Sequence, residues 1–244
     1  MSVQKKVAIL QSNYIPWKGY FDIIAMVDEF IFLDEVQFTK NDWRNRNKIK
    51  GPSGPVWLTI PVRHESLSQK IQDTQIASRN WSKKHWNAIS LYYSRAKAFN
   101  EYKDIFESLY KGITTNYLSE VNYIFIATIC NILQIKTKLN WSNNFNLSPE
   151  RSERLVDLCK QAKATHYLTG PSAKNYLNHE LFEQENIELE FMNYGAYPEY
   201  SQLYGPFIHE VSIIDLIFNE GPDAINYMKS FEKLNMPKLR LVKS

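Results

Sequence analysis

The chain has 244 residues, of which 44% are apolar and 23% are charged, and its formal net charge at pH 7 is +3. This composition is close to the average of globular proteins and excludes wholesale disorder, while so small a net charge does not indicate a nucleic-acid partner. No apolar run reaches the roughly 18 residues of a membrane-spanning helix, and the first residues lack the apolar stretch of a signal peptide, so we expect a cytoplasmic protein without a transmembrane segment.

The beginning of the chain predicts a parallel β-α-β unit. Residues 6–11 form a short apolar run typical of a buried strand, residues 20–27 carry apolar side chains at helical spacing, and residues 30–34 form a second apolar run. Strand, helix and strand in close succession indicate parallel pairing. Because parallel units carry ligand chemistry at the carboxyl ends of their strands, we expect residues 11–13 and 34–37 at one edge of the sheet.

The middle of the chain is expected to be mainly helical. A third strand is predicted at residues 56–62, and from there to residue 135 the apolar residues follow a helical period. Residues 140–147 are polar and rich in asparagine, which predicts a connecting loop.

A second layer of strands and helices is predicted in the last part of the chain. Ser148 and Pro149 suit the N-cap and the first turn of a helix, and residues 165–169 and 187–191 have the pattern of strands. Residues 211–228 predict two short helices, divided where a Gly-Pro pair interrupts the apolar pattern.

The order of these elements predicts an α/β fold in one domain, residues 5–235, with a mostly helical segment at about residues 80–137. Trp17-Lys18-Gly19-Tyr20, after the first strand, is similar to the Thr/His-x-Gly-His signature of nucleotidyltransferase-like folds. The similarity implies a Rossmann-like parallel sheet with a helical insertion. Both histidine positions are aromatic here, which puts adenylyl-transfer chemistry in doubt.

Residues directly after the first strand form a first candidate ligand site. A glycine there lets the backbone approach a ligand, and the start of the following helix offers unpaired N–H groups to a phosphate. The substrate-binding candidates are Gln11, Tyr14, Trp17, Gly19 and Tyr20.

The segment after the second strand is a second candidate site. Asp34 and Gln37 follow the strand directly, and Arg44 and Arg46 have the i, i+2 spacing that suits bidentate recognition of phosphate or carboxylate. Trp43 lies between charged residues, where an indole can stack on a flat ring beside a gripped phosphate. A solvated charged loop is the alternative interpretation.

The strand predicted at residues 165–169 leads into a third candidate segment. Gly170, Ser172 and Lys174 lie at the start of a short helix opened by Gly170-Pro171, a pattern that suits an anion nest. An ordinary capped helix start is the alternative interpretation.

The histidines supply the candidate catalytic bases. None of the five has the spacing of metal ligands, and the two cysteines form neither a disulfide framework nor a metal site, so no metal is expected. His85 and His209 are candidate general bases, and Asp215 follows His209 at i+6, a spacing that could bring them near one helix face. Structural roles for these residues are the alternative.

Taken together, these segments resemble the WbqC-like protein family. The resemblance extends over roughly residues 5–222. The matching pieces are residues 10–24, 28–37, 42–48, 57–62, 84–85, 167–172, 200–203 and 207–215.

The resemblance implies a role in the biosynthesis of bacterial O-antigen and other surface polysaccharides. It suggests an amide-forming transferase that moves a glycyl, aminoacyl or acyl group onto a nucleotide-linked amino sugar. ATP or an activated acyl donor would then be the co-substrate, and no nucleic-acid partner is expected. The oligomeric state is left open.

Residue type and placement give each candidate a role in such a reaction. Arg44, Arg46 and Lys174 are expected to hold the pyrophosphate, and Trp43 or Tyr14 to stack on the base. His85 or His209 would take a proton from the sugar amine, and Asp34 and Gln37 would orient sugar hydroxyls. Two alternatives stay open, an ATP-using ligase or nucleotidyltransferase of the same pathway and a non-catalytic protein that binds sugar nucleotides.

Overall fold

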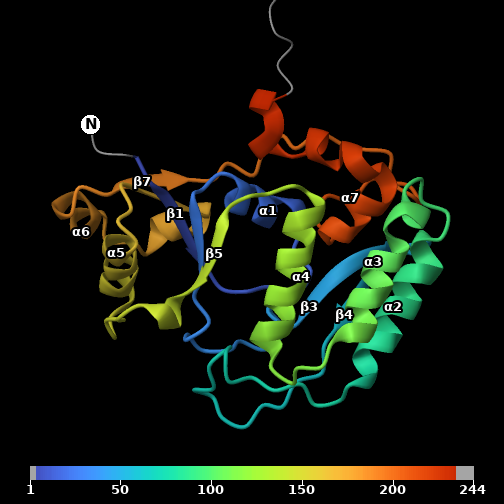
Figure 1. Ribbon diagram of the computed structural model, residues 1–244, viewed down its shortest axis with the longest axis horizontal. Helices are drawn as coiled ribbons and strands as arrows, with labels where there is room; N and C mark the ends of the chain where they lie inside the picture. Colours follow the sequence, from blue (N-terminus) through green and yellow to red (C-terminus); the bar gives the residue numbers. More distant parts are fainter. Residues whose placement is uncertain (1–3, 235–244) are drawn as a thin grey trace, which may run out of the picture.

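The computed structural model describes residues 4–234, and its centre is a five-stranded sheet in which every neighbouring pair is parallel. The strands lie in the order β5-β2-β1-β6-β7 (Figure 1). Their bounds are Lys6–Leu10 for β1, Glu29–Phe32 for β2, Lys138–Trp141 for β5, His166–Thr169 for β6 and Glu188–Phe191 for β7. The predicted α/β fold with a Rossmann-like parallel sheet is confirmed. Residue 235, the predicted end of the domain, lies outside the described residues.

Four of these strands lie within or next to the segments predicted as strands, and β5 does not. β5 overlaps residues 140–147, so the prediction of a loop there was wrong for its first residues. The physical reason is its place in the sheet. β5 pairs with β2 alone and none of its residues is fully buried, so no apolar run marks it in the sequence.

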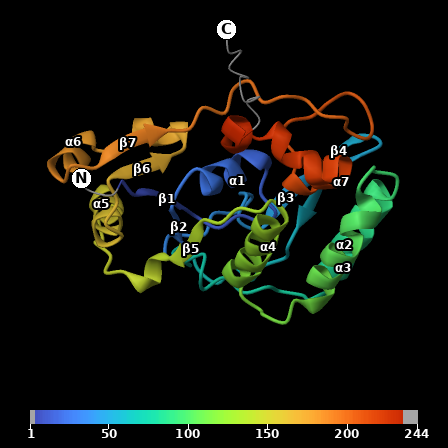
Figure 2. The ribbon, with the colours of Figure 1, turned by 45° about the horizontal axis from the view of Figure 1, so that its top comes forward.

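Helices cover both faces of the sheet, as the views in Figures 1 and 2 show. Ala8 and Phe30 belong to the apolar core shared with α1 and α4, whereas Val7 and Ile31 belong to the core shared with α5 and α6. This alternation of buried side chains follows from the two-residue period of strands. The four helices are α1 (Lys18–Ala25), α4 (Leu118–Ile132), α5 (Arg151–Gln161) and α6 (His179–Gln184).

A two-stranded antiparallel ribbon packs with helices beside the sheet. The prediction of a strand at 56–62 is met by β4, but β3 lies in a segment predicted as a charged loop. Residues 63–79 contain no helix, although the apolar period predicts one. The elements are β3 (Arg46–Gly51), β4 (Gly54–Thr59), α2 (Asn80–Tyr93), α3 (Phe99–Gly112) and α7 (Ile213–Glu220).

Short 3₁₀ helices connect several of these elements. The predicted break near residue 221 is confirmed, because α7 ends there and Gly221 takes a φ of 59°. The predicted N-cap Ser148 was wrong. Glu150 caps α5 instead, and its carboxylate accepts a hydrogen bond from the N–H of Glu153 at 2.8 Å. The 3₁₀ helices are η1 (Ser142–Asn144), η2 (Pro171–Asn175), η3 (Gly221–Tyr227) and η4 (Lys229–Leu234).

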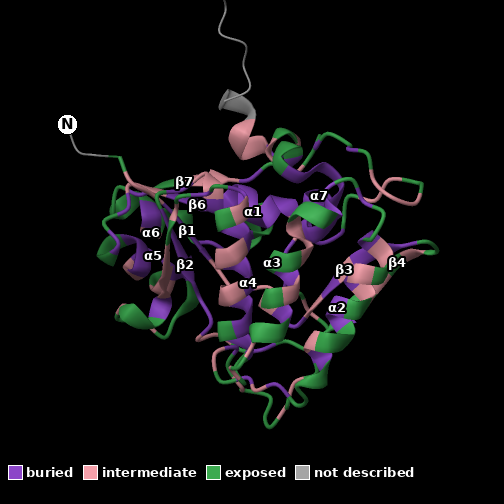
Figure 3. Ribbon diagram, turned by 45° about the vertical axis from the view of Figure 1, so that its right-hand side comes forward, coloured by how far each residue is buried: buried purple, intermediate pink, exposed green. Residues whose placement is uncertain are grey.

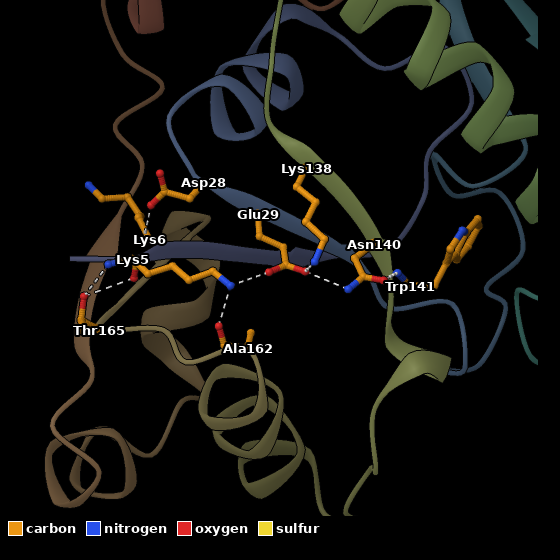
Figure 4. Close-up of polar contacts among 9 residues, drawn as sticks. All are labelled: Lys5, Lys6, Asp28, Glu29, Lys138, Asn140, Trp141, Ala162 and Thr165. Carbon is orange, nitrogen blue, oxygen red and sulfur yellow. Dashed lines mark hydrogen bonds and ion pairs between the residues drawn. The ribbon is translucent and has the colours of Figure 1, made fainter. Parts of the chain in front are cut away.

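An internal ion-pair network closes the amino end of the sheet (Figure 4). Glu29 is buried, and its carboxylate meets the ammonium groups of Lys5 at 2.6 Å and Lys138 at 2.9 Å. Asn140 donates a further hydrogen bond to it at 2.7 Å. Burial opposes the charged form, but these three partners together hold the pKa of Glu29 below its usual range. Polar groups at this end therefore satisfy one another.

The pattern of burial separates the centre of the molecule from its helical side (Figure 3). Seven of the eight residues of α1 are buried, whereas α2 buries only the face that contains Trp81, His85 and Ile89. Within residues 4–234, none of the helices combines the length and apolarity needed to span a bilayer.

Candidate ligand-binding site

The strand order reverses at the carboxyl ends of β1 and β6. From β1 the chain moves to β2 on one side of the sheet and later to β6 on the other side. Ligands of open α/β sheets bind where the strand order reverses in this way. Residues 11–13 follow β1 and Gly170 follows β6, so two of the three predicted segments meet at this edge.

Arg44 is fixed at the carboxyl end of β1. Its guanidinium donates hydrogen bonds to the side-chain oxygen of Asn13 and, at 3.2 Å, to that of Gln11, and it lies 3.6 Å from the carboxylate of Asp42. The backbone oxygen of Arg44 accepts a hydrogen bond from Asn122 at 2.9 Å. Arg44 is thus a positioned cation at the carboxyl edge of the sheet, where open α/β sheets generally bind ligands.

Hydrogen bonds to neighbouring segments hold the loop that carries Arg44. The N–H of Tyr14 donates to the oxygen of Trp43 at 3.0 Å, and the amide of Asn47 donates to the oxygens of Tyr14 and Ile15 at 3.1 and 2.9 Å. Asn45 and Ile60 exchange two further bonds. The loop is therefore preorganised, with its side chains supported from the interior.

A cavity of about 310 Å³ opens beside this loop. Gly19 allows Trp17 to form part of its wall, because a Cβ on residue 19 would lie 2.4 Å from the indole of Trp17. The expectation that Gly19 admits a ligand to the backbone was therefore wrong, since the Trp17 ring fills that space. The cavity is lined by Asn13, Pro16, Trp17, Trp43, Asn47 and Glu210.

Aromatic and cationic side chains extend the site onto the ribbon. The rings of Trp43 and Trp57 lie 5.6 Å apart, and both side chains are partly exposed. The guanidinium of Arg46 lies 3.7 Å from the ring of Trp57. The Nη1 of Arg46 also donates to the side chain of Asn41 at 3.1 Å, so the guanidinium is held between the ribbon and the loop before it.

Asp34 and Gln37 hold the chain rather than line the cavity. Asp34 is buried and accepts hydrogen bonds from the N–H of Ser12 at 2.8 Å and from the hydroxyl of Ser119. Burial raises the pKa of its carboxyl, and these hydrogen bonds offset that rise only in part. The amide of Gln37 donates to the oxygen of Leu67 at 2.5 Å. The prediction that these two residues orient sugar hydroxyls does not agree with these contacts.

Tyr14 and Tyr20 lie in the core beneath the site. Tyr14 is fully buried, and its hydroxyl lies 2.9 Å from Nδ1 of His85 and 2.7 Å from the hydroxyl of Tyr110. The hydroxyl of Tyr20 donates to the oxygen of Gln11 at 2.9 Å. Tyr14 therefore has no free face on which a base could stack, and Tyr20 supports the strand end.

Burial also removes His85 from the list of accessible bases. The side chain of His85 is 6% exposed, and burial lowers its pKa to about 4. Its polar neighbour is Tyr14, a core residue. The predicted role of His85 as a general base at a ligand amine does not fit this position, because a ligand cannot reach the ring.

His209 and Asp215 do not share a helix face. α7 begins at Ile213, so His209 lies in the preceding turn, where it is exposed and contacts Phe207. Asp215 is fully buried and accepts hydrogen bonds from the hydroxyls of Tyr93 and Tyr200 at 2.7 and 2.6 Å. The i, i+6 spacing misled because the helix starts after His209.

The third predicted segment lies at the same edge of the sheet, directly after β6. The ammonium of Lys174 is 5.0 Å from the ring of Phe191, the last residue of β7. Gly170 is the N-cap of η2, and Ser172 is exposed on its first turn. The ring that Lys174 contacts thus belongs to the edge strand β7, whereas Arg44 lies at the end of β1.

Several residues of the site were not predicted from the sequence. Trp57, Lys48 and Glu210 flank the cavity or the ribbon, and Asn47 supports them. A signal for the ribbon is present in the alternation of residues 45–49, where Asn45, Asn47 and Ile49 are buried. It is weak because two of the buried residues are amides.

A metal or thiol centre is not found in the part of the chain that the structure describes. No group of three histidine, cysteine, aspartate or glutamate side chains is arranged to hold a metal ion there. Cys130 and Cys159 are buried and unpaired, and burial raises the pKa of both thiols. The candidate site therefore consists of aromatic, amide and cationic side chains with one carboxylate.

Comparison with known proteins gives one family and one close relative. A model of the WbqC-like protein family matches residues 11–227. The chain is 45% identical over 226 residues to the "Uncharacterized protein Rv1507c" of Mycobacterium tuberculosis, an alignment that covers 92% of this chain and 98% of the mycobacterial protein. No solved structure was found to match the chain.

Proposed function

Because this chain belongs to the WbqC-like protein family, we propose that it is an amide-forming transferase that acts on a nucleotide-linked amino sugar in surface-polysaccharide biosynthesis. The observation that carries the proposal is Arg44, held by Gln11 and Asn13 at the carboxyl end of β1 beside a cavity walled by Trp17 and Trp43. The Arg44 guanidinium can bind a diphosphate, and the tryptophan rings and the Asn13 amide can bind a sugar.

The charge of the site suits a diphosphate ester. Arg44 offers a planar set of N–H donors that matches phosphate oxygens, and Arg46 and Lys48 add positive charge along the ribbon. Lys174 lies at the same edge of the sheet and can reach only a ligand that extends across β6. Arg44 is therefore the first residue to test.

The proposed reaction joins the sugar amine to an activated carboxyl group. The amine nitrogen attacks the carbonyl carbon of a thioester or acyl-phosphate donor, the new C–N bond forms, and the bond to the sulfur or phosphate oxygen breaks. The carboxylate of Glu210, which lines the cavity, accepts the amine proton, and that proton leaves with the thiolate or phosphate. Glu210 takes the role first assigned to His85 or His209.

A second candidate function is binding of a sugar nucleotide without catalysis. It is favoured by one observation. Glu210 is the only ionisable side chain lining the described cavity, and its carboxylate lies 3.4 Å from the ammonium of Lys48, which competes for it. A protein with this site could hold a sugar nucleotide for another enzyme.

The test is a product assay with the purified protein. A uridine- or thymidine-diphosphate amino sugar is incubated with glycine and ATP, or with an acyl thioester, and the sugar nucleotide is analysed by mass spectrometry. A mass gain of one glycyl or acyl unit supports the transferase. Nucleotide binding with no product from any donor favours the binding protein, and absence of both binding and product refutes both proposals.

Variants of Arg44 locate the reaction in this site. Arg44→Ala is expected to weaken binding of the sugar nucleotide about 10- to 150-fold, the effect of losing charged hydrogen bonds, and Arg44→Lys to restore only part of it. Lys40→Ala is the control, because Lys40 is an exposed cation of the same segment. Equal losses in the Lys40 and Arg44 variants would mean that general charge, not the positioned guanidinium, binds the ligand.

A further inference from the structure

The ribbon presents one buried face and one polar-aromatic face. In β3 and β4, Ile49 and Leu58 point into the core, whereas Lys48 and Trp57 face each other across the strands as a registered pair. Side chains of a strand alternate between its faces, so Arg46 lies on the outer face with Lys48. The outer face thus gathers two cations around an indole.

Trp43 completes this surface from the adjoining loop. The indoles of Trp43 and Trp57 are inclined by 31° with centroids 5.6 Å apart, and their side chains are 42% and 43% exposed. The ammonium of Lys48 lies 5.8 Å from the Trp43 ring and 5.3 Å from the Trp57 ring. A preorganised loop and a strand thus keep two large rings at the surface, where another ring can stack on one of them.

The same surface is continuous with the cavity. Trp43 belongs to both, because its ring contacts Trp57 on one side and its side chain lines the cavity with Trp17. Positive charge lies on the ribbon, whereas the carboxylate of Glu210 and the amide of Asn13 lie at the cavity. The site therefore has a cationic aromatic end on the ribbon and a polar end at the cavity.

We propose that Trp57 and Trp43 form the platform on which the nucleobase of the substrate stacks. The phosphates then lie between Arg46, Lys48 and Arg44, and the sugar enters the cavity. This inference rests on the proposed function and adds to it the direction of the ligand and the role of Trp57. Aromatic platforms beside cations are the general means of holding a base and its phosphates.

The test compares a ligand that has a base with one that lacks it. Binding of uridine diphosphate and of inorganic pyrophosphate is measured by calorimetry for the wild type, Trp57→Ala and Trp57→Phe. Trp57→Ala is expected to weaken uridine diphosphate about 5- to 150-fold, the effect of losing one base–ring stack, and to leave pyrophosphate unchanged. Trp57→Phe should recover most of the loss.

Tyr117→Ala is the matched control, because Tyr117 is 41% exposed and lies before α4, outside the ribbon. It should leave both affinities unchanged. Near-equal binding of uridine diphosphate by the wild type and Trp57→Ala would overturn the platform, and so would equal wild-type affinity for the two ligands. In both cases product formation would still decide the transferase separately. If the wild type binds neither ligand, the proposed function fails together with the platform.

Discussion

Two polar regions of this molecule, one around Asp215 and one around Arg44, differ in where the partners of the charged side chain lie. Around Asp215, every partner is internal, since Tyr93, Tyr200 and Gln202 all donate to its carboxylate within 2.7 Å. Around Arg44, the partners Gln11 and Asn13 hold the guanidinium from the protein side, beside an open cavity. The first arrangement is closed and the second leaves room for a ligand.

The difference shows how to separate structural polar groups from binding groups. A buried charge that is surrounded by donors belongs to the architecture, because opening it to a ligand would leave those donors unpaired. A cation held on one side at the carboxyl edge of a parallel sheet is ready for an anion. Substitutions should therefore change stability in the first region and binding or turnover in the second.

The largest effect on stability is expected for Asp215→Asn. The change removes the charge that faces the buried Lys50, and it places an amide N–H₂ where the hydroxyls of Tyr93 and Tyr200 donate. Breaking a buried ionic cluster by removal of one partner costs about 3–5 kcal/mol of unfolding free energy. Urea denaturation of the wild type and of Asp215→Asn measures this loss of unfolding free energy.

An exposed ion pair supplies the control for Asp215. Asp223 lies 3.6 Å from the ammonium of Lys97, and their side chains are 60% and 70% exposed. Asp223→Asn should cost no more than about 1 kcal/mol. A loss for Asp215→Asn as small as that for Asp223→Asn would mean that the closed cluster does not support the fold.

A smaller effect, visible only on acidification, is expected from His85. Its pKa is about 4 in the folded protein because burial disfavours the charged ring, whereas an unfolded histidine has a pKa of about 6.5. The unfolded state therefore binds a proton first as the pH falls. The contribution of His85 to the unfolding free energy is therefore complete above pH 6.5. It falls by about 3 kcal/mol as the pH is lowered from 6.5 to 4.

Comparison of the wild type with His85→Gln isolates this contribution from other titrating groups. The difference between their unfolding free energies, measured by urea denaturation from pH 7 to 4, should shrink by about 3 kcal/mol. Parallel pH profiles for the two proteins would show that His85 is accessible to protons in the folded state. Its assignment to the closed interior would then be wrong.

The sheet could be predicted from the sequence because its central strands are apolar on both faces. Residues 6–11 and 30–34 form such runs, and they become β1 and β2. β3 was not predicted because Asn47, near its start, and Asn45, just before it, are buried polar residues whose amides donate to backbone oxygens. Hydrogen bonds to distant segments have no sequence period.

The sequence predicts where the candidate site lies, but it does not predict all of the residues that form it. Arg44 and Trp43 were expected at the strand edge, and the cavity and ribbon lie beside them. The sequence could not distinguish Trp43 from Tyr14 as a stacking ring, since only the packing of α2 and α3 over Tyr14 buries it. Glu210 escaped because its position depends on the chain before α7 returning to the ribbon.

Glu210→Gln is expected to change stability little and turnover strongly, and it therefore tests the difference between the two regions most directly. The Glu210 side chain is 78% exposed, so loss of its contact with Lys48 should cost no more than about 1 kcal/mol of unfolding free energy. Glu107, which pairs with Lys111 on the exposed surface of α3, is the control. If Glu210 accepts the amine proton, turnover should fall about 10²- to 10⁴-fold while affinity for the sugar nucleotide is kept. Glu107→Gln should leave turnover unchanged. Unchanged turnover in Glu210→Gln would show that Glu210 is not the base. The site around Arg44 would then be a binding site only.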